Sequence, residues 1–259
     1  LWLGNDGAMI DSAGFDIGIT MNLQNFSGQT GSLAKVGNGT LTLTGSNGYS
    51  GGTTINGGSL KANRNTLGTG AVVINDGGTL YANDQWVLCG ANPYNVAERN
   101  IGTLTINAGG TLQFDATNGF ANGVTNLYLN GGWVTGGPNN FRGDLFLWNG
   151  NEQITAGGAT TSTIATIIGV TGNNNIITVD GGSTLNITGG IKNSDWNNNG
   201  STPGGFIKAG SGTLTLSGAN SYSSGTTVDG GTLKIAGRNQ LPANGGITVA
   251  TGATLLTDA

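Results

Sequence analysis

Histidine is absent from this 259-residue chain, and cysteine occurs once, at Cys89. Without histidine the chain cannot form a Ser-His-Asp triad, a Cys-His nucleophile pair or a histidine metal site. A single cysteine also excludes an internal disulfide framework and a multi-cysteine metal site. Cys89 is either a small buried thiol or one half of an intermolecular disulfide. The sequence therefore predicts no cofactor and no metal.

Charge is scarce as well, since charged residues make up 8% of the chain against about 25% in typical proteins. The nine basic residues are scattered singly and the net charge is −4, so no basic patch predicts a nucleic-acid partner. No apolar run approaches the ~18 residues that cross a bilayer as a helix. We expect neither nucleic-acid binding nor membrane insertion by this segment.

Glycine is abundant, with 51 residues, and in excess it can signal disorder. Glycine and proline together reach roughly 21% of the chain, below the ~25–30% that marks low-complexity sequences. The small net charge does not hold the chain open by self-repulsion, and the apolar residues follow a regular period. These features predict a folded chain.

That period comes from a short recurring signature: one or two glycines, one or two small residues, then leucine. Most copies follow one another at steps near 20 residues, and a longer step is one step plus an insertion or a missed copy. The copies end at Leu41, Leu60, Leu80, Leu112, Leu185, Leu214, Leu233 and Leu255, with a looser match at Val134.

Within each step the apolar residues alternate with polar ones. In the segments 39–43 and 212–216, both Gly-Thr-Leu-Thr-Leu, leucine falls on one face and threonine on the other, which is typical of a half-buried strand. Gly-Gly pairs preceded by Asn or Asp supply the positive φ angles that tight corners need. No helical periodicity is present, and glycine is too frequent to propagate a helix.

A coil of about 20 residues, built from short strands and glycine corners, predicts an all-β fold, a single parallel β-helix of about twelve coils. Stacked coils lie about 4.8 Å apart, so the rod would be on the order of 60 Å long. Like charges stacked at that spacing would repel, whereas Asn can form amide ladders. The alternative architecture is an antiparallel sandwich or barrel.

One block of the chain occurs twice, at an offset of 173 residues. Residues 35–61 and 208–234 share 18 identities in 27 aligned positions. Both copies resemble the autotransporter-associated β-strand repeat of bacterial passenger regions. The residues that carry the resemblance include Gly39, Leu41, Leu43, Tyr49 and Leu60 in the first copy, and Gly212, Leu214, Leu216, Tyr222 and Leu233 in the second. Ser224 stands where the first copy has Gly51, at an expected corner.

The resemblance implies a right-handed β-helix, export, and display outside the cell. It supplies no catalytic residues, because the repeat is a scaffold. We expect no signal peptide at Leu1, and the given sequence starts and stops in strand-like segments. We expect residues 1–259 to form one continuous β-helix domain, as a mature segment or a fragment of a longer exported protein.

Catalysis has weak support in the sequence. A polysaccharide-degrading β-helix enzyme needs several carboxylates on one face, and inverting hydrolysis needs two carboxyls about 6.5–9.5 Å apart. The thirteen acids here are dispersed, and Asp76, Asp180 and Asp229 each precede a Gly-Gly corner, where turn formation explains them.

The tripeptide Arg142-Gly143-Asp144 is of the type that integrins bind. A sequence of only three residues also arises by chance.

Three segments break the coil pattern and are expected to be inserted loops, near residues 81–100, 138–153 and 192–205. Binding residues often lie on loops that project from a rigid scaffold. The aromatic residues Trp86, Tyr94, Trp148 and Trp196 would either contact glycans or a protein partner, or cover a widened part of the core.

These observations leave two non-enzymatic functions. The first is an extracellular structural rod of a bacterial surface protein, acting as a stalk or adhesin scaffold and contacting neighbouring repeats or surface glycans. The second is a self-assembling subunit of an extracellular filament or sheath, whose partners are further copies of itself, because unpaired strand edges at coil ends favour pairing. A polysaccharide-degrading enzyme is the third and weakest reading.

Overall fold

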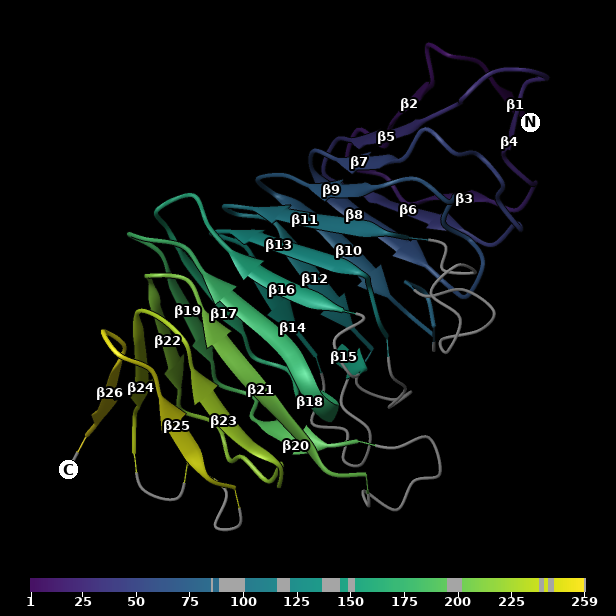
Figure 1. The fold of residues 1–259 in the computed structure, drawn as a ribbon. Helices are drawn as coiled ribbons and strands as arrows, with labels where there is room; N and C mark the ends of the chain where they lie inside the picture. The colour runs from purple at the N-terminus through teal and green to yellow at the C-terminus, as the bar shows by residue number, and fades with distance from the viewer. Residues whose placement is uncertain are drawn as a thin grey trace.

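The computed structural model describes residues 1–84, 86–88, 101–115, 122–136, 145–148, 152–194, 202–237, 240–241 and 245–258. These residues contain only strands and connecting turns, without helices. Every ladder between named strands is parallel, as in β5–β7 and β22–β24. The predicted all-β parallel solenoid is therefore confirmed (Figure 1).

Two long sheets run along the stack. Sheet I contains, along its main path, β2 (Ala8–Asp11), β5 (Leu33–Val36), β7 (Thr53–Ile55), β9 (Val72–Ile74), β11 (Thr103–Asn107), β13 (Asn126–Asn130), β16 (Gln153–Ala156), β18 (Ile168–Val179), β21 (Gly204–Ala209), β23 (Gly225–Val228) and β25 (Ile247–Val249). Sheet II contains β3 (Ile17–Ile19), β6 (Thr40–Leu43), β8 (Gly58–Ala62), β10 (Gly78–Ala82), β12 (Thr111–Phe114), β14 (Trp133–Thr135), β17 (Thr161–Ile164), β19 (Thr184–Ile187), β22 (Thr213–Leu216), β24 (Thr232–Ile235) and β26 (Thr254–Thr257).

A third, shorter edge closes each coil between a strand of sheet II and the next strand of sheet I. At the N-terminal end, β1 (Trp2–Leu3) pairs with β4 (Gln24–Asn25). Further along, β15 (Leu145–Trp148) and β20 (Ile191–Asn193) both pair with the first part of β18. In these described coils, one strand lies in sheet I, one lies in sheet II, and a short segment lies at this edge.

The prediction of about twelve coils was slightly too high, since each long sheet stacks eleven strands along its main path. Leu80 pairs directly with Leu112, so that longer step forms a single coil. The step from Val134 to Leu185 instead contains a copy that the signature missed. Strand β17 lies between them, and its Ser162 occupies the position of Leu185 in the next coil.

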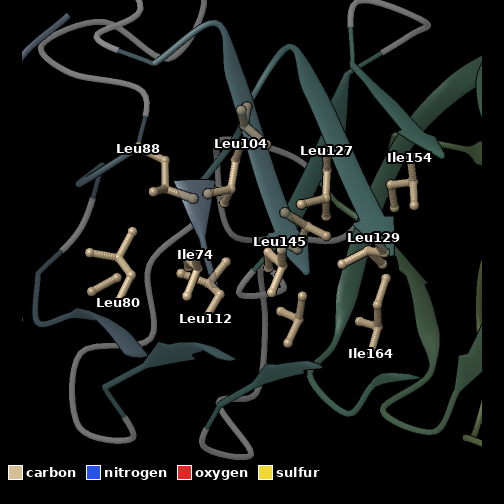
Figure 2. Packing of buried hydrophobic residues seen from close by; sticks show 14 of the residues in the cluster. Ile74, Leu80, Leu88, Leu104, Leu112, Leu127, Leu129, Leu145, Ile154 and Ile164 are labelled. Carbon is tan, nitrogen blue, oxygen red and sulfur yellow. The ribbon is translucent and has the colours of Figure 1, made fainter. Parts of the chain in front are cut away.

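The core is a column of apolar side chains enclosed by the two sheets and the third edge. Alternate residues of each strand point inward, as the Leu/Thr alternation predicted, and Leu41, Leu43 and Leu60 are fully buried. In Figure 2, Leu104, Leu127 and Ile154 of sheet I follow one another along the stack. Because every coil shares this column with its neighbours, no coil buries its apolar face alone.

Outside the core, asparagine side chains form the predicted amide ladder. Asn75 Nδ2 donates to Asn56 Oδ1 over 2.6 Å, and Asn107 Nδ2 donates to Asn75 Oδ1 over 2.7 Å. Asn130 Nδ2 extends the ladder to Asn107 Oδ1 at 3.1 Å. These four residues lie at the ends of successive strands of sheet I, so the ladder connects four coils without stacking like charges.

Candidate functional site

The sequence-predicted contact residues lie mostly outside the described part of the chain. Tyr94, Trp196, the tripeptide Arg142-Gly143-Asp144 and Cys89 fall there, so their roles remain predictions. Trp148 belongs to β15, of which the structure describes the backbone at that position.

Trp86 is described and half-buried, and Arg64 lies over it, with the guanidinium carbon 4.5 Å from the ring centroid. Its φ of 59° is in a region that bulky residues seldom adopt. Arginine stacking on an indole is a favourable cation–π arrangement. The Arg64 guanidinium group therefore stabilises the position of the Trp86 ring.

The duplicated block contains a buried lysine that the sequence analysis did not single out. Lys35 Nζ donates to the carbonyl oxygens of Val36, Gly37 and Gly57 at 2.9, 2.7 and 3.0 Å. Gly57 belongs to the next coil, so the ammonium group connects the corners of two successive coils by hydrogen bonds. The aliphatic part of the side chain lies in the inward column, beside Ile55, as the stems of long charged residues often do.

Lys208 repeats this arrangement in the second copy. Its Nζ donates to the carbonyl oxygens of Ala209, Gly210 and Gly230 at 2.9, 2.6 and 2.9 Å. Burial lowers the pKa of Lys208 to about 8 and also lowers the pKa of Lys35, although Asp11 opposes that second shift. Three carbonyl partners satisfy all three donors of an ammonium group, so each lysine acts as a structural clamp.

A buried tyrosine forms the second part of the repeated unit. The Tyr49 hydroxyl is hydrogen-bonded to Thr53 Oγ1 at 2.7 Å, and Tyr222 contacts Thr226 Oγ1 at 2.5 Å. The Tyr222 ring also packs edge-to-face on Phe206, with centroids 5.4 Å apart. Burial raises the pKa of Tyr222 to about 12 and raises that of Tyr49. A buried phenol with a hydrogen-bond partner fixes the corner that precedes the next strand of sheet I.

Asn47 forms the third part, because its side chain joins three successive coils. Its Oδ1 accepts from Leu23 N at 2.7 Å, and its Nδ2 donates to Thr66 O at 2.5 Å. Asn220 does the same, accepting from Ile191 N at 2.7 Å and donating to Gln240 O. Both ends of each amide are thus satisfied by backbone groups that would otherwise be buried without partners.

The coil before each copy also carries a matching asparagine, outside the duplicated block itself. Asn25 donates to Ser50 Oγ at 2.8 Å and accepts from Ser50 N at 3.1 Å. Asn193 makes the same two bonds to Ser223, at 2.8 and 3.0 Å. Each copy is therefore joined to its preceding coil by the same pair of asparagine–serine hydrogen bonds.

The two copies differ at a predicted corner, where Gly51 in the first copy is replaced by Ser224 in the second. The residue with the corner conformation is the next one along the chain in each copy. The residues with positive φ are Gly52, at 91°, and Gly225, at 113°. Both copies keep this glycine, and Ser224 replaces Gly51, which does not have positive φ. The corner conformation is therefore the same in both copies.

Two exposed aromatic residues of the sheet faces were missed, because the sequence analysis looked for aromatics only where the coil pattern breaks. Trp133 of β14 is 51% exposed on the outward face of sheet II, and Tyr128 of β13 is 40% exposed on sheet I. Their outward position could have been found from the alternation alone, since each follows or precedes an inward apolar residue.

Residues able to hold a metal ion do not cluster, since no group of three or more His, Cys, Asp or Glu side chains is found among the described residues. The described part also contains no helix long and apolar enough to span a membrane.

Comparison with protein families finds the repeated unit twice. Residues 33–62 and 206–235 match the model of the Passenger-associated-transport-repeat. Comparisons with curated proteins and with solved structures gave no significant match. The two matched segments contain the lysine, asparagine and tyrosine networks described above, and the predicted resemblance to autotransporter passenger repeats is confirmed. The chain is a parallel β-solenoid that carries two passenger-associated transport repeats.

Proposed function

We propose that this chain is a non-catalytic structural rod of a bacterial surface protein, exported and acting as a stalk or adhesin scaffold. The observation that carries the proposal is that both repeats are built into the same two ladders as the other coils. A stack of eleven strands at about 4.8 Å gives a rod of roughly 50 Å. Such a rod holds attached segments at a distance from the surface.

The chemistry of the repeated unit supports a mechanical role. The amine of Lys208 is enclosed by three carbonyl groups, and the hydroxyl of Tyr222 is buried against Thr226. The lysine ammonium group thus joins two coils, and the tyrosine hydroxyl is hydrogen-bonded within its own coil. The sequence contains no histidine, the side chain that most often serves as a general acid or base near neutral pH.

Surface exposure of the native protein tests this proposal. Intact cells that produce the full protein are labelled with antibody raised against this 259-residue segment, and external protease is added to a parallel sample. We expect labelling without permeabilisation, and loss of the label after protease treatment, while a cytoplasmic protein in the same cells stays intact. Labelling that requires permeabilised cells would contradict the proposal.

A filament subunit is the second candidate, because apolar side chains are exposed at both ends of the described stack. The inward-facing side chains of the terminal coils pack against the core but are only partly buried: Ile10, Ile17 and Ile19 in the first coil, and Ile247 and Leu255 in the last. End-to-end stacking of copies would cover these side chains and continue both ladders.

Light scattering separates the two candidates. For the rod we expect a mass near 25.9 kDa that does not change with protein concentration. Regular fibres that grow with concentration, and that the double variant Ile17→Asp with Leu255→Asp prevents, would favour the filament, because these inward-facing residues lie in the two terminal coils. The matched control is Tyr128→Asp, an exposed aromatic position on the side of the rod.

A further inference from the structure

The outward face of sheet II between β6 and β14 is rich in hydroxyl groups. In one row across these strands, Ser59, Thr79, Thr111 and Trp133 occupy paired positions on successive coils. In the adjacent row, Lys61, Tyr81 and Gln113 do the same. The strands that form this face lie side by side in Figure 1. We call these two rows the sheet II platform.

Lys61 and Tyr81 form the charged and aromatic centre of the platform. The Lys61 ammonium nitrogen lies 5.5 Å from the Tyr81 ring centroid. Together with Thr40 and Ser59, these two residues line a shallow depression on the surface. The depression thus combines a cation, an aromatic ring and two hydroxyl groups.

The second repeat shows that the scaffold does not require this combination. Lys234 stands at the position of Lys61, but its neighbour in the next coil is Leu256, where the first repeat has Tyr81. Lys234 is also neutralised by Asp258, with nitrogen and oxygen 3.4 Å apart. Within the described part of the chain, Lys61 has no such ion pair. The same coil geometry is therefore stable without an aromatic ring and without an unpaired cation.

The second aromatic residue, Trp133, lies two strands beyond Tyr81 in the stack. Neighbouring strands are about 4.8 Å apart, so the two residues are separated by roughly 10 Å along the rod and by a further ~7 Å along the strands. Thr111 and Gln113 lie on the strand between them. Two aromatic rings with hydroxyl and amide groups between them match alternate rings of an extended sugar chain.

We propose that the sheet II platform binds an extended acidic polysaccharide, one that contains uronic acid units. The apolar C–H faces of the sugar rings pack on Tyr81 and Trp133, and sugar hydroxyls bond to the Thr111 hydroxyl and the Gln113 amide. A sugar carboxylate pairs with Lys61. The strands of the platform carry Lys61 and no acidic residue, although the chain as a whole has a net charge of −4. This local charge favours an anionic ligand.

Titration of the purified chain with polygalacturonate, and with a neutral β-glucan of similar length, tests the proposal. We expect the wild-type chain to bind polygalacturonate more tightly and to lose affinity as salt is added. The variants Tyr81→Ala and Trp133→Ala should each weaken binding about tenfold, the equivalent of ~1.4 kcal/mol per ring. Lys61→Gln should remove the preference for the acidic polymer.

Matched variants serve as controls for each substitution. Tyr81→Leu gives the first repeat the residue pair of the second and should weaken binding as much as Tyr81→Ala. Lys234→Gln changes the paired lysine and should leave binding unchanged, as should Tyr128→Ala on sheet I. Unchanged melting temperatures would show that these surface variants remain folded.

Four results would overturn the proposal. One is that wild-type protein binds neither polymer, and another is that Tyr81→Ala and Trp133→Ala bind like wild type. The third is equal affinity for the neutral and acidic polymers. Capture of a protein ligand such as gelatin by the same face, without polysaccharide binding, would also overturn it. The proposal does not depend on the cellular location of the chain.

Discussion

The Gly78→Ala variant is expected to lose about 3 kcal/mol or more of its free energy of unfolding, as overpacked sites do. A Cβ atom at this position would lie 2.6 Å from the carbonyl oxygen of Ile55 and 3.0 Å from that of Asn75. Both obstacles are backbone atoms in paired or turn segments, so neither can move without breaking hydrogen bonds. The φ angle of Gly78 is not positive, and the effect is therefore one of space alone.

Denaturant unfolding measures this loss, and Gly102→Ala is the matched control. A Cβ atom at Gly102 would have no heavy atom within 4 Å, so we expect a change within about 0.5 kcal/mol. Gly110 stands at the position of Gly78 in the next coil and meets the carbonyl oxygen of Ile74 at 2.7 Å, so Gly110→Ala should behave like Gly78→Ala. A similar small loss in all three variants would show that the coils can separate to make room.

The glycine corners also explain how much of the fold the sequence predicted. The spacing of Gly-Thr-Leu located most strands of sheet II, because a Cβ atom at glycines such as Gly39 and Gly58 would collide with the backbone of the preceding coil. The Leu/Thr alternation then decided which side chains point inward. β17 was missed because Ser162 takes the inward position where the signature has leucine, and a hydroxyl there breaks the pattern but not the ladder.

The buried networks could not be predicted from periodicity. The alternation places residue 35 on the inward face, but a lysine at such a position would ordinarily be assigned to the surface. What permits Lys35 is a set of three carbonyl oxygens supplied by two different coils, and that set exists only after the coils stack. The one signal in the sequence was the identity of Lys35 with Lys208, Asn47 with Asn220 and Tyr49 with Tyr222.

The sheet II platform could not be predicted from the sequence either, because its residues come together only when the coils stack. Tyr81 and Trp133 are separated by more than 50 residues in the chain, and only the ladders β10–β12 and β12–β14 bring them onto one face. The register also shows which lysine is paired. Lys61 and Lys234 occupy the same position of the repeat, and their difference depends on Tyr81 and Asp258 in neighbouring coils.

The free energy of unfolding is expected to rise with pH from about pH 8, pass through a maximum near pH 10, and then fall. The buried lysines cause the rise. The pKa of Lys208 is about 8 in the folded state, against 10.5 when exposed, so between these values the unfolded chain binds more protons. Stability then increases with pH by up to about 1.4 kcal/mol per pH unit for one such group. Lys35, whose pKa is also lowered, acts in the same direction.

The buried tyrosines cause the fall. The pKa of Tyr222 is about 12 in the folded state and 10.0 when exposed, so between these values the folded chain keeps a proton that the unfolded chain loses, and stability decreases as pH rises. Urea unfolding at intervals from pH 7 to pH 12 measures the whole profile. Lys208→Met should flatten the rising part and Tyr222→Phe the falling part, each incompletely, because Lys35 and Tyr49 remain. Two results would contradict this prediction: a wild-type free energy of unfolding that falls steadily from pH 8, or a Lys208→Met variant whose stability rises as much as that of wild type. Either result would show that the pKa of the buried lysines is not lowered by folding.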